Sequence, residues 1–510
     1  MSKEKPGISK NFAILSVGQM ISRVLAFAVT IQMTRVLLPD EYGAVVFAMT
    51  VLAYVGIVVD FGFDAWGPLE VARGITPVPT IVKSVLSLRL LMLMPALVGL
   101  AIATYFMPLP PLTKTIILIS GATMIPSALD LNWVFLGSKS MVPAIVSDCL
   151  CQLLMASGVF LLVKHPDDVM YVPIMQVATR AVAVGYLMVT YTRTFGRLNL
   201  GWEGETVRKF VTGSLPLVGS ALVGRIIENF DILLLGIWVG SEATGLYGAS
   251  FRVVWMLVLI TVAYYTALRP TLAQAYVQGF HTIEALLNRV MRISAAIAVG
   301  ASVGGILVAE PLVDFLYGKA YLPAVPALQV LLALFGLHML SRTYRVTLIS
   351  FNKQGNDLRI MSLAALVNVV LNFLVIKKYG IMGAALANFA CEFLILVLDY
   401  FAAQKFVGRI PLGRHLWKPA IAACFMYPIV QATHHLHLLV QIALAGGAYV
   451  GLVFLFRAIT MDDVKAILNR QKKTADEKIE TLAAQAEALA QETDAGGPEA
   501  NLNPPCVAGK

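Results

Sequence analysis

Long apolar runs alternate with short polar connections from the start of the chain to about residue 458. The runs form fourteen segments, each near the roughly 20 residues that a helix needs to cross the hydrocarbon core of a membrane. The segments are 12–38, 43–63, 81–106, 113–136, 142–163, 169–191, 213–238, 246–268, 286–309, 324–349, 357–376, 381–403, 415–433 and 437–458. This pattern predicts an all-α polytopic membrane protein with about 14 transmembrane helices.

The first and seventh segments share a pattern of glycine and arginine. Gly18 precedes Arg23 by five residues and Gly219 precedes Arg225 by six, and an acidic residue and a Tyr-Gly pair follow in both copies. Chance similarity between apolar runs is the alternative, but it does not explain an arginine in the middle of both segments. Because both copies begin on the same side, we expect a parallel repeat of two pseudo-symmetric six-helix lobes, followed by two extra C-terminal helices.

These features divide the chain into five parts. Residues 1–192 form an N-terminal lobe, 193–212 a cytoplasmic basic linker, 213–404 a C-terminal lobe and 405–458 the last two spans, and 459–510 form a charged tail. Thr460 and Asp463 have the spacing of a capping box, which predicts that the tail begins as a helix. Its Pro- and Gly-containing end predicts disorder.

Composition supports a membrane environment. Of the 510 residues, 58% are hydrophobic and 14% are charged, whereas soluble domains average about 25% charged residues. A soluble enzyme, a nucleic-acid-binding domain and a secreted scaffold are therefore excluded. The five cysteines lack disulfide or zinc-ligand spacing, and no nucleotide-binding loop occurs. We expect no catalytic residues, no metal, no cofactor and no nucleic-acid partner.

The net charge of +9 reflects membrane topology. Most of the 39 Lys and Arg residues lie in the even-numbered connections and at the two ends, and cytoplasmic segments carry such an excess. Both termini are therefore expected in the cytoplasm. The same rule explains the cluster of Lys405, Arg409, Arg414 and Lys418 better than a polyanionic ligand does.

Arginines within the segments are the informative exceptions. The candidates for contact with a substrate are Arg23, Arg225, Arg180, Arg35, Arg252 and Arg342. An arginine at the bilayer centre costs about 2.5–3.5 kcal/mol, so these side chains either line a wet cavity that handles anions or form structural ion pairs. Glu228 and Asp231 follow Arg225 along its helix and are candidates for ion pairing or ion coupling.

Five short motifs resemble those of a known group of transporters. They are Thr34-Arg-Val-Leu-Leu-Pro-Asp-Glu-Tyr-Gly43, Asp130-Leu-Asn-Trp133 through Met141, Asp231-Ile-Leu-Leu-Leu-Gly236 with Glu242 and Tyr247, Phe315-Leu-Tyr-Gly318 with Tyr321, and Asn368 and Asn372 leading to Tyr379-Gly380. In this order they resemble the bacterial O-antigen and exopolysaccharide flippases of the multidrug/oligosaccharidyl-lipid/polysaccharide exporter superfamily.

The resemblance implies two lobes in a V that alternate between inward and outward openings, in the bacterial cytoplasmic membrane. It also implies a cargo, an undecaprenyl-pyrophosphate-linked oligosaccharide, with membrane lipids and other polysaccharide-assembly proteins as further partners. Peptidoglycan-precursor flippases in the superfamily line their cavity with arginines on the first and eighth spans, which Arg23 and Arg252 match by span.

Two other functions stay open. A cation-coupled multidrug-type exporter of the same superfamily would need a carboxylate facing its cavity, such as Glu228 or Asp231. A polysaccharide polymerase or ligase would need a large outer loop with catalytic residues, and the outer connections here are short.

Overall fold

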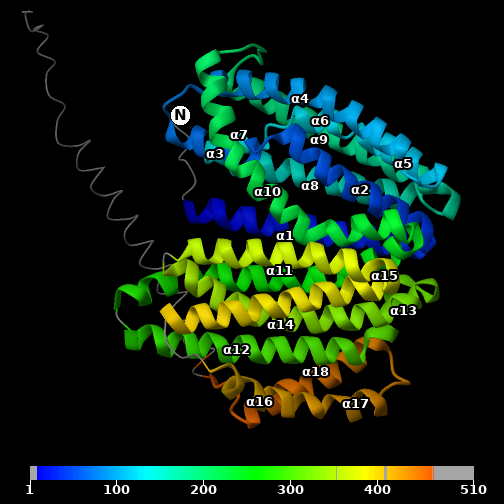
Figure 1. The fold of residues 1–510 in the computed structure, drawn as a ribbon, viewed down its shortest axis with the longest axis vertical. Coiled ribbons are helices and arrows are strands. Elements are labelled where there is room, and N and C mark those ends of the chain that lie inside the picture. Colours follow the sequence, from blue (N-terminus) through cyan, green and yellow to red (C-terminus); the bar gives the residue numbers. More distant parts are fainter. Residues whose placement is uncertain (1–7, 279, 352, 407–410, 462, 464–510) are drawn as a thin grey trace, which may run out of the picture.

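The computed structural model describes residues 8–278, 280–351, 353–406, 411–461 and 463. Within these ranges the regular structure is helical throughout (Figure 1). The tail predicted to follow the capping box lies outside the described residues.

The first half of the chain begins with a long helix and continues through nine further elements. They are α1 (Ile8–Val36), α2 (Pro39–Asp60), α3 (Phe63–Arg73), α4 (Val78–Phe106), α5 (Pro111–Gly121), α6 (Met124–Ala128), α7 (Asn132–Gly137), α8 (Met141–Leu162), the 3-10 helix η1 (Pro166–Met170) and α9 (Tyr171–Phe195).

The second half begins with the two longest uninterrupted helices. Its elements are α10 (Gly204–Trp238), α11 (Ser241–Gln278), α12 (Phe280–Leu307), α13 (Ala309–Tyr317), the 3-10 helix η2 (Lys319–Ala324), α14 (Val325–Ser350), α15 (Gln354–Phe406), α16 (Leu412–Cys424), α17 (Met426–Ala432) and α18 (Leu438–Leu455).

Each of the fourteen predicted segments coincides with a helix or with a set of broken helices. The fourth segment is split into α5, α6 and α7, the thirteenth into α16 and α17, and the eleventh and twelfth are joined in α15. Within the described residues, eleven helical stretches are long and apolar enough to cross a membrane. The prediction of an all-α polytopic membrane protein is confirmed.

Local chemistry explains the breaks. Gly380 adopts φ +54° and ψ −131° inside α15, a left-handed conformation that glycine tolerates and most residues do not. Between α6 and α7, the Asp130 carboxylate accepts a hydrogen bond from the backbone N–H of Asn132 at 2.8 Å. The Asp130 carbonyl accepts one from the Trp133 indole at 3.2 Å. These bonds satisfy polar groups that a broken helix would otherwise leave unpaired in the membrane.

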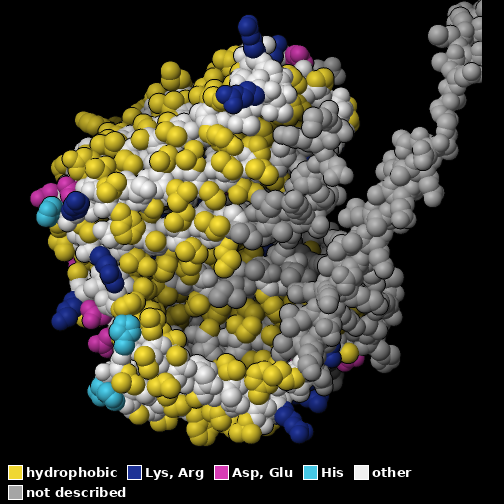
Figure 2. Space-filling view, turned by 180° about the vertical axis from the view of Figure 1, so that it is seen from behind, with side chains coloured by type: hydrophobic (Ala, Val, Ile, Leu, Met, Phe, Trp, Pro, Cys, Tyr) yellow, Lys and Arg dark blue, Asp and Glu magenta, His cyan; other side chains and the backbone are white. Residues whose placement is uncertain are grey.

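The helices form two groups, one from the first half of the chain and one from the second (Figure 1). Helices α16 to α18 lie beyond α12 at the edge of the second group, while α10 contacts α2 and α3 as well as α15. Hydrophobic side chains cover the middle of the face in Figure 2, and charged and histidine side chains lie at its margins. This distribution suits a protein surrounded by lipid.

The two groups share one core at one end and have separate cores at the other. The largest apolar cluster joins α1, α2 and α5 to α11, α13 and η2, at the end that the charge pattern assigns to the outside. At the opposite end, one cluster joins α3, α4 and α7 to the start of α10, and another joins α11, α12, α14 and α15. The two groups therefore share a core at one end, called the outer end below after its predicted side. At the other end, called the inner end, the apolar side chains form separate clusters, one of which includes the start of α10.

Candidate functional site

A cavity of about 420 Å³ lies between the two groups of helices. Its lining comes from α1, α2, α10 and α11, the helices that begin the two copies of the repeat predicted from the sequence. The polar lining residues are Arg23, Thr50, Arg225, Glu228, Asn229 and Arg252. The rest is apolar and includes Phe27, Phe251 and Trp255. Such a surface can hold an anionic group beside an apolar one.

The arginines give the cavity a positive charge. Three arginines against one glutamate leave a formal net charge of +2 in its lining. Arg225 forms an ion pair with Glu228 at 3.5 Å, and their side chains are 47% and 44% exposed, so the pairing expected from their spacing is confirmed. No ion pair of Arg23 or Arg252 occurs among the side chains that the structure describes. The Arg252 guanidinium also forms a side-chain hydrogen bond with Tyr42 of α2. Because a guanidinium has five N–H donors, both arginines still have donors for a ligand.

Local packing positions these side chains. The Tyr54 hydroxyl of α2 donates a hydrogen bond to the Arg225 carbonyl at 3.1 Å, which connects the first group of helices to α10 beside the cavity. Trp255 lies three residues after Arg252 and therefore on the same face of α11. Helix periodicity was the available signal for Trp255 as a lining residue, and the sequence prediction missed it.

Arg35 lies apart from the cavity, at the outer seam between the halves. Its guanidinium donates hydrogen bonds to the carbonyls of Phe315 and Leu316 at 2.6 and 3.1 Å. It also lies 5.9 Å from the centre of the Phe315 ring. In this conformation Arg35 joins the end of α1 to α13.

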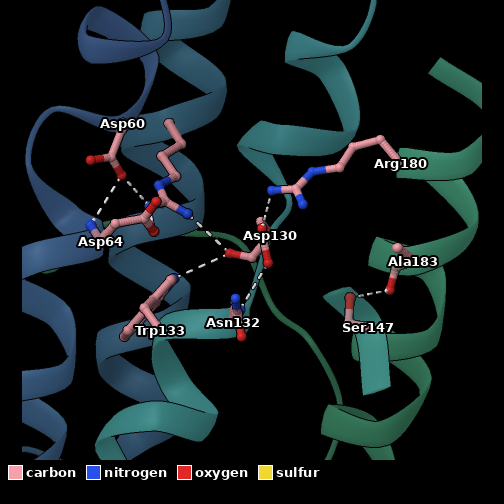
Figure 3. Close-up of polar contacts among 9 residues, drawn as sticks. Asp60, Asp64, Asp130, Asn132, Trp133, Ser147, Arg180 and Ala183 are labelled. Carbon is pink, nitrogen blue, oxygen red and sulfur yellow. Dashed lines mark hydrogen bonds and ion pairs between the residues drawn. The ribbon is translucent and has the colours of Figure 1, made fainter. Parts of the chain in front are cut away.

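Arg180 lies within the first group of helices, where Figure 3 shows it pointing toward Asp130. The Arg180 guanidinium and the Asp130 carboxylate form an ion pair at 2.5 Å between α9 and the break after α6. Because the partner is largely buried and the two charges cancel, this arginine fits the structural ion pair that the sequence left open.

Arg89 completes the same network. Its buried guanidinium pairs with Asp60, with Asp64 at 2.7 Å, and with the Asp130 carbonyl at 3.0 Å. The network ties α4 to the turn between α2 and α3, where Phe61 has φ +49° and Gly62 φ +78°. Asp60 and Asp64 are partners that the sequence prediction missed.

Arg342 belongs to a polar cluster between α14 and α15. Its Nε lies 3.2 Å from His338 Nε2, and His338 Nδ1 lies 3.2 Å from Glu392. Ser341 donates to the same carboxylate at 2.8 Å. These groups do not line the cavity.

Asp231 is buried and also lies outside the cavity lining. Its carboxylate accepts hydrogen bonds from the Tyr247 hydroxyl at 2.5 Å and from the Asn388 amide at 2.7 Å. Asn368 donates to Asn388 at 2.7 Å and accepts from Asn372 at 2.9 Å. The two asparagines of α15 thus join helices, as their spacing predicts, and Asn388 is the member that sequence reasoning missed.

Among the described residues, no group of three or more His, Cys, Asp or Glu side chains is placed to hold a metal ion.

Two family models match the chain. The model described as polysaccharide biosynthesis protein matches residues 8–276, and the model described as lipid II flippase MurJ matches residues 170–462. Each match covers more than half of the 510 residues.

Curated relatives match shorter stretches. The probable flippase AglR of Haloferax volcanii is 24% identical over 185 residues, which are 36% of this chain and 39% of that protein. The teichuronic acid biosynthesis protein TuaB of Bacillus subtilis is 29% identical over 123 residues, which are 24% of this chain and 25% of that protein. The matches therefore span less than half the length of these relatives.

Solved transporters share the fold. The lipid II flippase MurJ in an inward closed conformation has a TM-score of 0.70 and 14% identity, covering 87% of this chain and 98% of that chain. A multidrug resistance MATE family transporter in an inward-facing conformation has a TM-score of 0.60 and 14% identity, covering 78% and 98%.

Proposed function

We propose, because the chain belongs to the polysaccharide biosynthesis protein family, that it is a flippase that moves a lipid-linked oligosaccharide across a membrane. The cargo would be an undecaprenyl-pyrophosphate-linked repeat unit, and the membrane the bacterial cytoplasmic membrane with both termini inside. The relatives named as flippases support this activity. In this proposal the protein is a transporter and not an enzyme, and polysaccharide-assembly proteins supply and use its cargo.

The observation that carries the proposal is the placement of Arg23, Arg225 and Arg252 around one cavity between the halves. A pyrophosphate needs charge-assisted donors where water is scarce, and arginine offers planar bidentate ones. The apolar lining beside the arginines suits the lipid portion nearest the headgroup. The rest of the prenyl chain stays in the bilayer while the headgroup crosses.

The membrane potential favours export of such an anion. A negative charge that leaves a negative interior gains about 2.3 kcal/mol per 100 mV if nothing neutralises it. Arg23 and Arg252 assist by lowering the cost of desolvating the headgroup, since each can pair with it inside the cavity.

Substitution of the cavity arginines tests the proposal. Arg23→Gln and Arg252→Gln should each reduce export of surface polysaccharide about tenfold or more, because one hydrogen bond to a charged group contributes about 1.5–3 kcal/mol. The measurement is surface polysaccharide per protein molecule in a strain that lacks the native gene. The lipid-linked precursor should accumulate on the inner leaflet.

Arg193→Gln is the matched control, because Arg193 is exposed at the end of α9 and away from the cavity. It should export at the unmodified rate. Full export by both cavity variants at normal protein abundance would contradict the role of the cavity.

A cation-coupled multidrug exporter is the second candidate, favoured by the shared fold with a MATE transporter. In that case Glu228, which lines the cavity, or Asp231, which is buried outside its lining, couples ion movement to transport. Glu228→Gln should then abolish efflux of amphipathic cations. Protection of cells from such cations, with no change in polysaccharide, would favour this function over the flippase. A polymerase or ligase ranks last, since the outer connections are short.

A further inference from the structure

A second cavity, about 460 Å³ in volume, lies where α12, α16 and the end of α18 meet. It shares no lining residue with the central cavity. Four cations line it, Arg292, Arg414, Lys418 and Arg457, and its lining contains no carboxylate. This basic pocket lies at the end of the molecule that the charge pattern assigns to the cytoplasm.

The positive-inside rule explains why basic residues are frequent here but does not explain why they converge. Arg292 is compensated by Asp463, whose carboxylate lies 2.7 Å from its Nη2 and 3.0 Å from the Nε of Arg289. No ion pair of Arg414, Lys418 or Arg457 occurs in the described part of the chain. Three positive charges therefore line one pocket without a carboxylate partner among the described residues, and a bound anion would relieve their repulsion.

Arg457 occupies a backbone position where glycine is usual. Its φ is +50°, and the Arg457 and Ala458 amides donate to the Phe454 and Val453 carbonyls at 3.0 and 2.9 Å. This is the closing turn of a helix, in which a left-handed residue other than glycine costs about 1 kcal/mol. The Arg457 carbonyl also accepts a hydrogen bond from Lys418 at 3.4 Å, which holds the two cations together.

The neutral residues of the pocket are fixed. His415 is buried, and its Nε2 lies 3.0 Å from the Asn288 side-chain oxygen. The Asn288 amide in turn donates to the Glu284 carbonyl at 2.9 Å. Because His415 and Asn288 already have partners, the charged donors that the pocket offers an anion are its guanidinium and ammonium groups.

The surroundings of the pocket are those of a membrane interface. Trp417 is 53% exposed, with the Lys418 ammonium 5.6 Å from its ring centre, and Ile421 is 44% exposed one turn further along the same face. Tryptophan concentrates at the level of lipid headgroups, and apolar side chains below it contact acyl chains. A soluble anion would not contact Trp417 or Ile421, whereas a lipid would.

We propose that the basic pocket binds the phosphate group of an anionic phospholipid in the inner leaflet. Arg414, Lys418 and Arg457 hold the phosphate, while the acyl chains run along the exposed face of α16 past Trp417 and Ile421. The headgroup then joins α16 to the end of α18. This site is independent of the cargo cavity and of the proposed flippase activity.

Arg457→Gly is the most informative variant, because it removes one cation and also relieves the left-handed strain. The full-length protein is extracted from membranes that contain phosphatidylglycerol and phosphatidylcholine, and retained lipid is counted by native mass spectrometry. Retention of phosphatidylglycerol should fall about fivefold, since one basic residue near an anionic surface contributes about 1 kcal/mol. Thermal stability in pure phosphatidylcholine should stay equal or rise.

Arg197→Gln is the charge-matched control, because Arg197 is exposed and lies outside the pocket, and it should retain phosphatidylglycerol normally. The proposal is overturned if Arg457→Gly and Arg414→Gln both retain as much phosphatidylglycerol as the unmodified protein. A second result would also overturn it. If added inorganic phosphate raises the thermal stability of the unmodified protein but not of Arg457→Gly, and the two retain equal amounts of phosphatidylglycerol, the ligand is a soluble anion.

Discussion

Asp463 shows what one carboxylate contributes at the residue scale. The capping box predicted from Thr460 and Asp463 is confirmed, since the Thr460 amide and hydroxyl donate to the carboxylate at 3.1 and 2.9 Å and the Asp463 amide lies 3.3 Å from the Thr460 hydroxyl. Burial raises the pKa of Asp463, but the hydrogen bonds from Thr460 and Arg289 and the charge of Arg292 outweigh it. The net pKa is lowered.

A lowered pKa in the folded state makes this contribution dependent on pH. It is fully present above the carboxylate's unfolded pKa of about 3.9, and it is lost as pH falls through the lower folded value. We expect Asp463→Asn to lower the thermal stability of the detergent-solubilised protein at neutral pH, and the difference from the unmodified protein to vanish in strong acid. A difference that persists there would show that the carboxylate charge is not the cause.

Residue type and spacing predict which groups carry charge in the membrane, but not which of them are compensated. Arg225 and Glu228 are three residues apart on one helix, so their pair was predictable. Arg180 and Asp130 are 50 residues apart, and Arg89 and Asp64 are 25 apart. Their pairing depends on how separate helices pack, which no local pattern specifies. The same limit applies to Arg252, whose place beside Arg23 requires α1 and α11 to meet.

At the scale of elements, the closest contact between the halves is the crossing of α2 and α11. A Cβ added at Gly43 would lie 1.7 Å from the Ser241 carbonyl oxygen, and one added at Gly245 would lie 2.0 Å from the Pro39 carbonyl oxygen. Both neighbours are backbone atoms that cannot move aside as a side chain can. The two glycines therefore let the outer ends of α2 and α11 touch.

Gly43→Ala should separate these helices. Overpacking typically costs about 1–3 kcal/mol of stability. Because the added methyl group would destabilise the contact between the outer ends of α2 and α11, we expect lower thermal stability and a higher share of molecules open on the outer side. The measurement is labelling of Thr113→Cys by a thiol reagent that does not cross the membrane. Gly56→Ala is the control on the same helix, because nothing lies within 4 Å of its added Cβ. Equal labelling in the two variants would contradict the role of the contact.

The helices were largely predictable from the sequence, because a helix that spans the hydrocarbon core must be apolar over about 20 residues. The sequence did not predict where helices break within a span, as between α6 and α7. There the Asp130 carboxylate accepts a hydrogen bond from the Asn132 backbone N–H, and the Asp130 carbonyl accepts one from the Trp133 indole. Such breaks are tolerated only when folded neighbours satisfy the backbone, so they follow from tertiary structure.

At the scale of the whole molecule, the shared outer core and the separate inner clusters fit one state of the alternating-access transport proposed above. Polar bonds add to the outer seal: the Tyr321 hydroxyl donates to the Leu37 carbonyl at 3.2 Å, and Arg35 binds the Phe315 carbonyl. If transport proceeds by alternating access, as proposed, these contacts must break in each cycle while inner contacts form. The free energies of the two states then differ by only a few kcal/mol.

A covalent bond across the outer seal tests that requirement. The hydroxyl oxygens of Thr113 on α5 and Ser241 on α11 lie 3.2 Å apart and are buried, so Thr113→Cys with Ser241→Cys places two sulfur atoms where a bond of about 2.05 Å can form with little movement. Oxidation should then stop export, and a reductant should restore it, because the halves can no longer separate on the outer side. Each single variant, oxidised in the same way, should export normally and so controls for the native cysteines. Undiminished export by a fully cross-linked double variant would mean that the cargo crosses without the outer ends of α5 and α11 parting, which excludes alternating access through this seam.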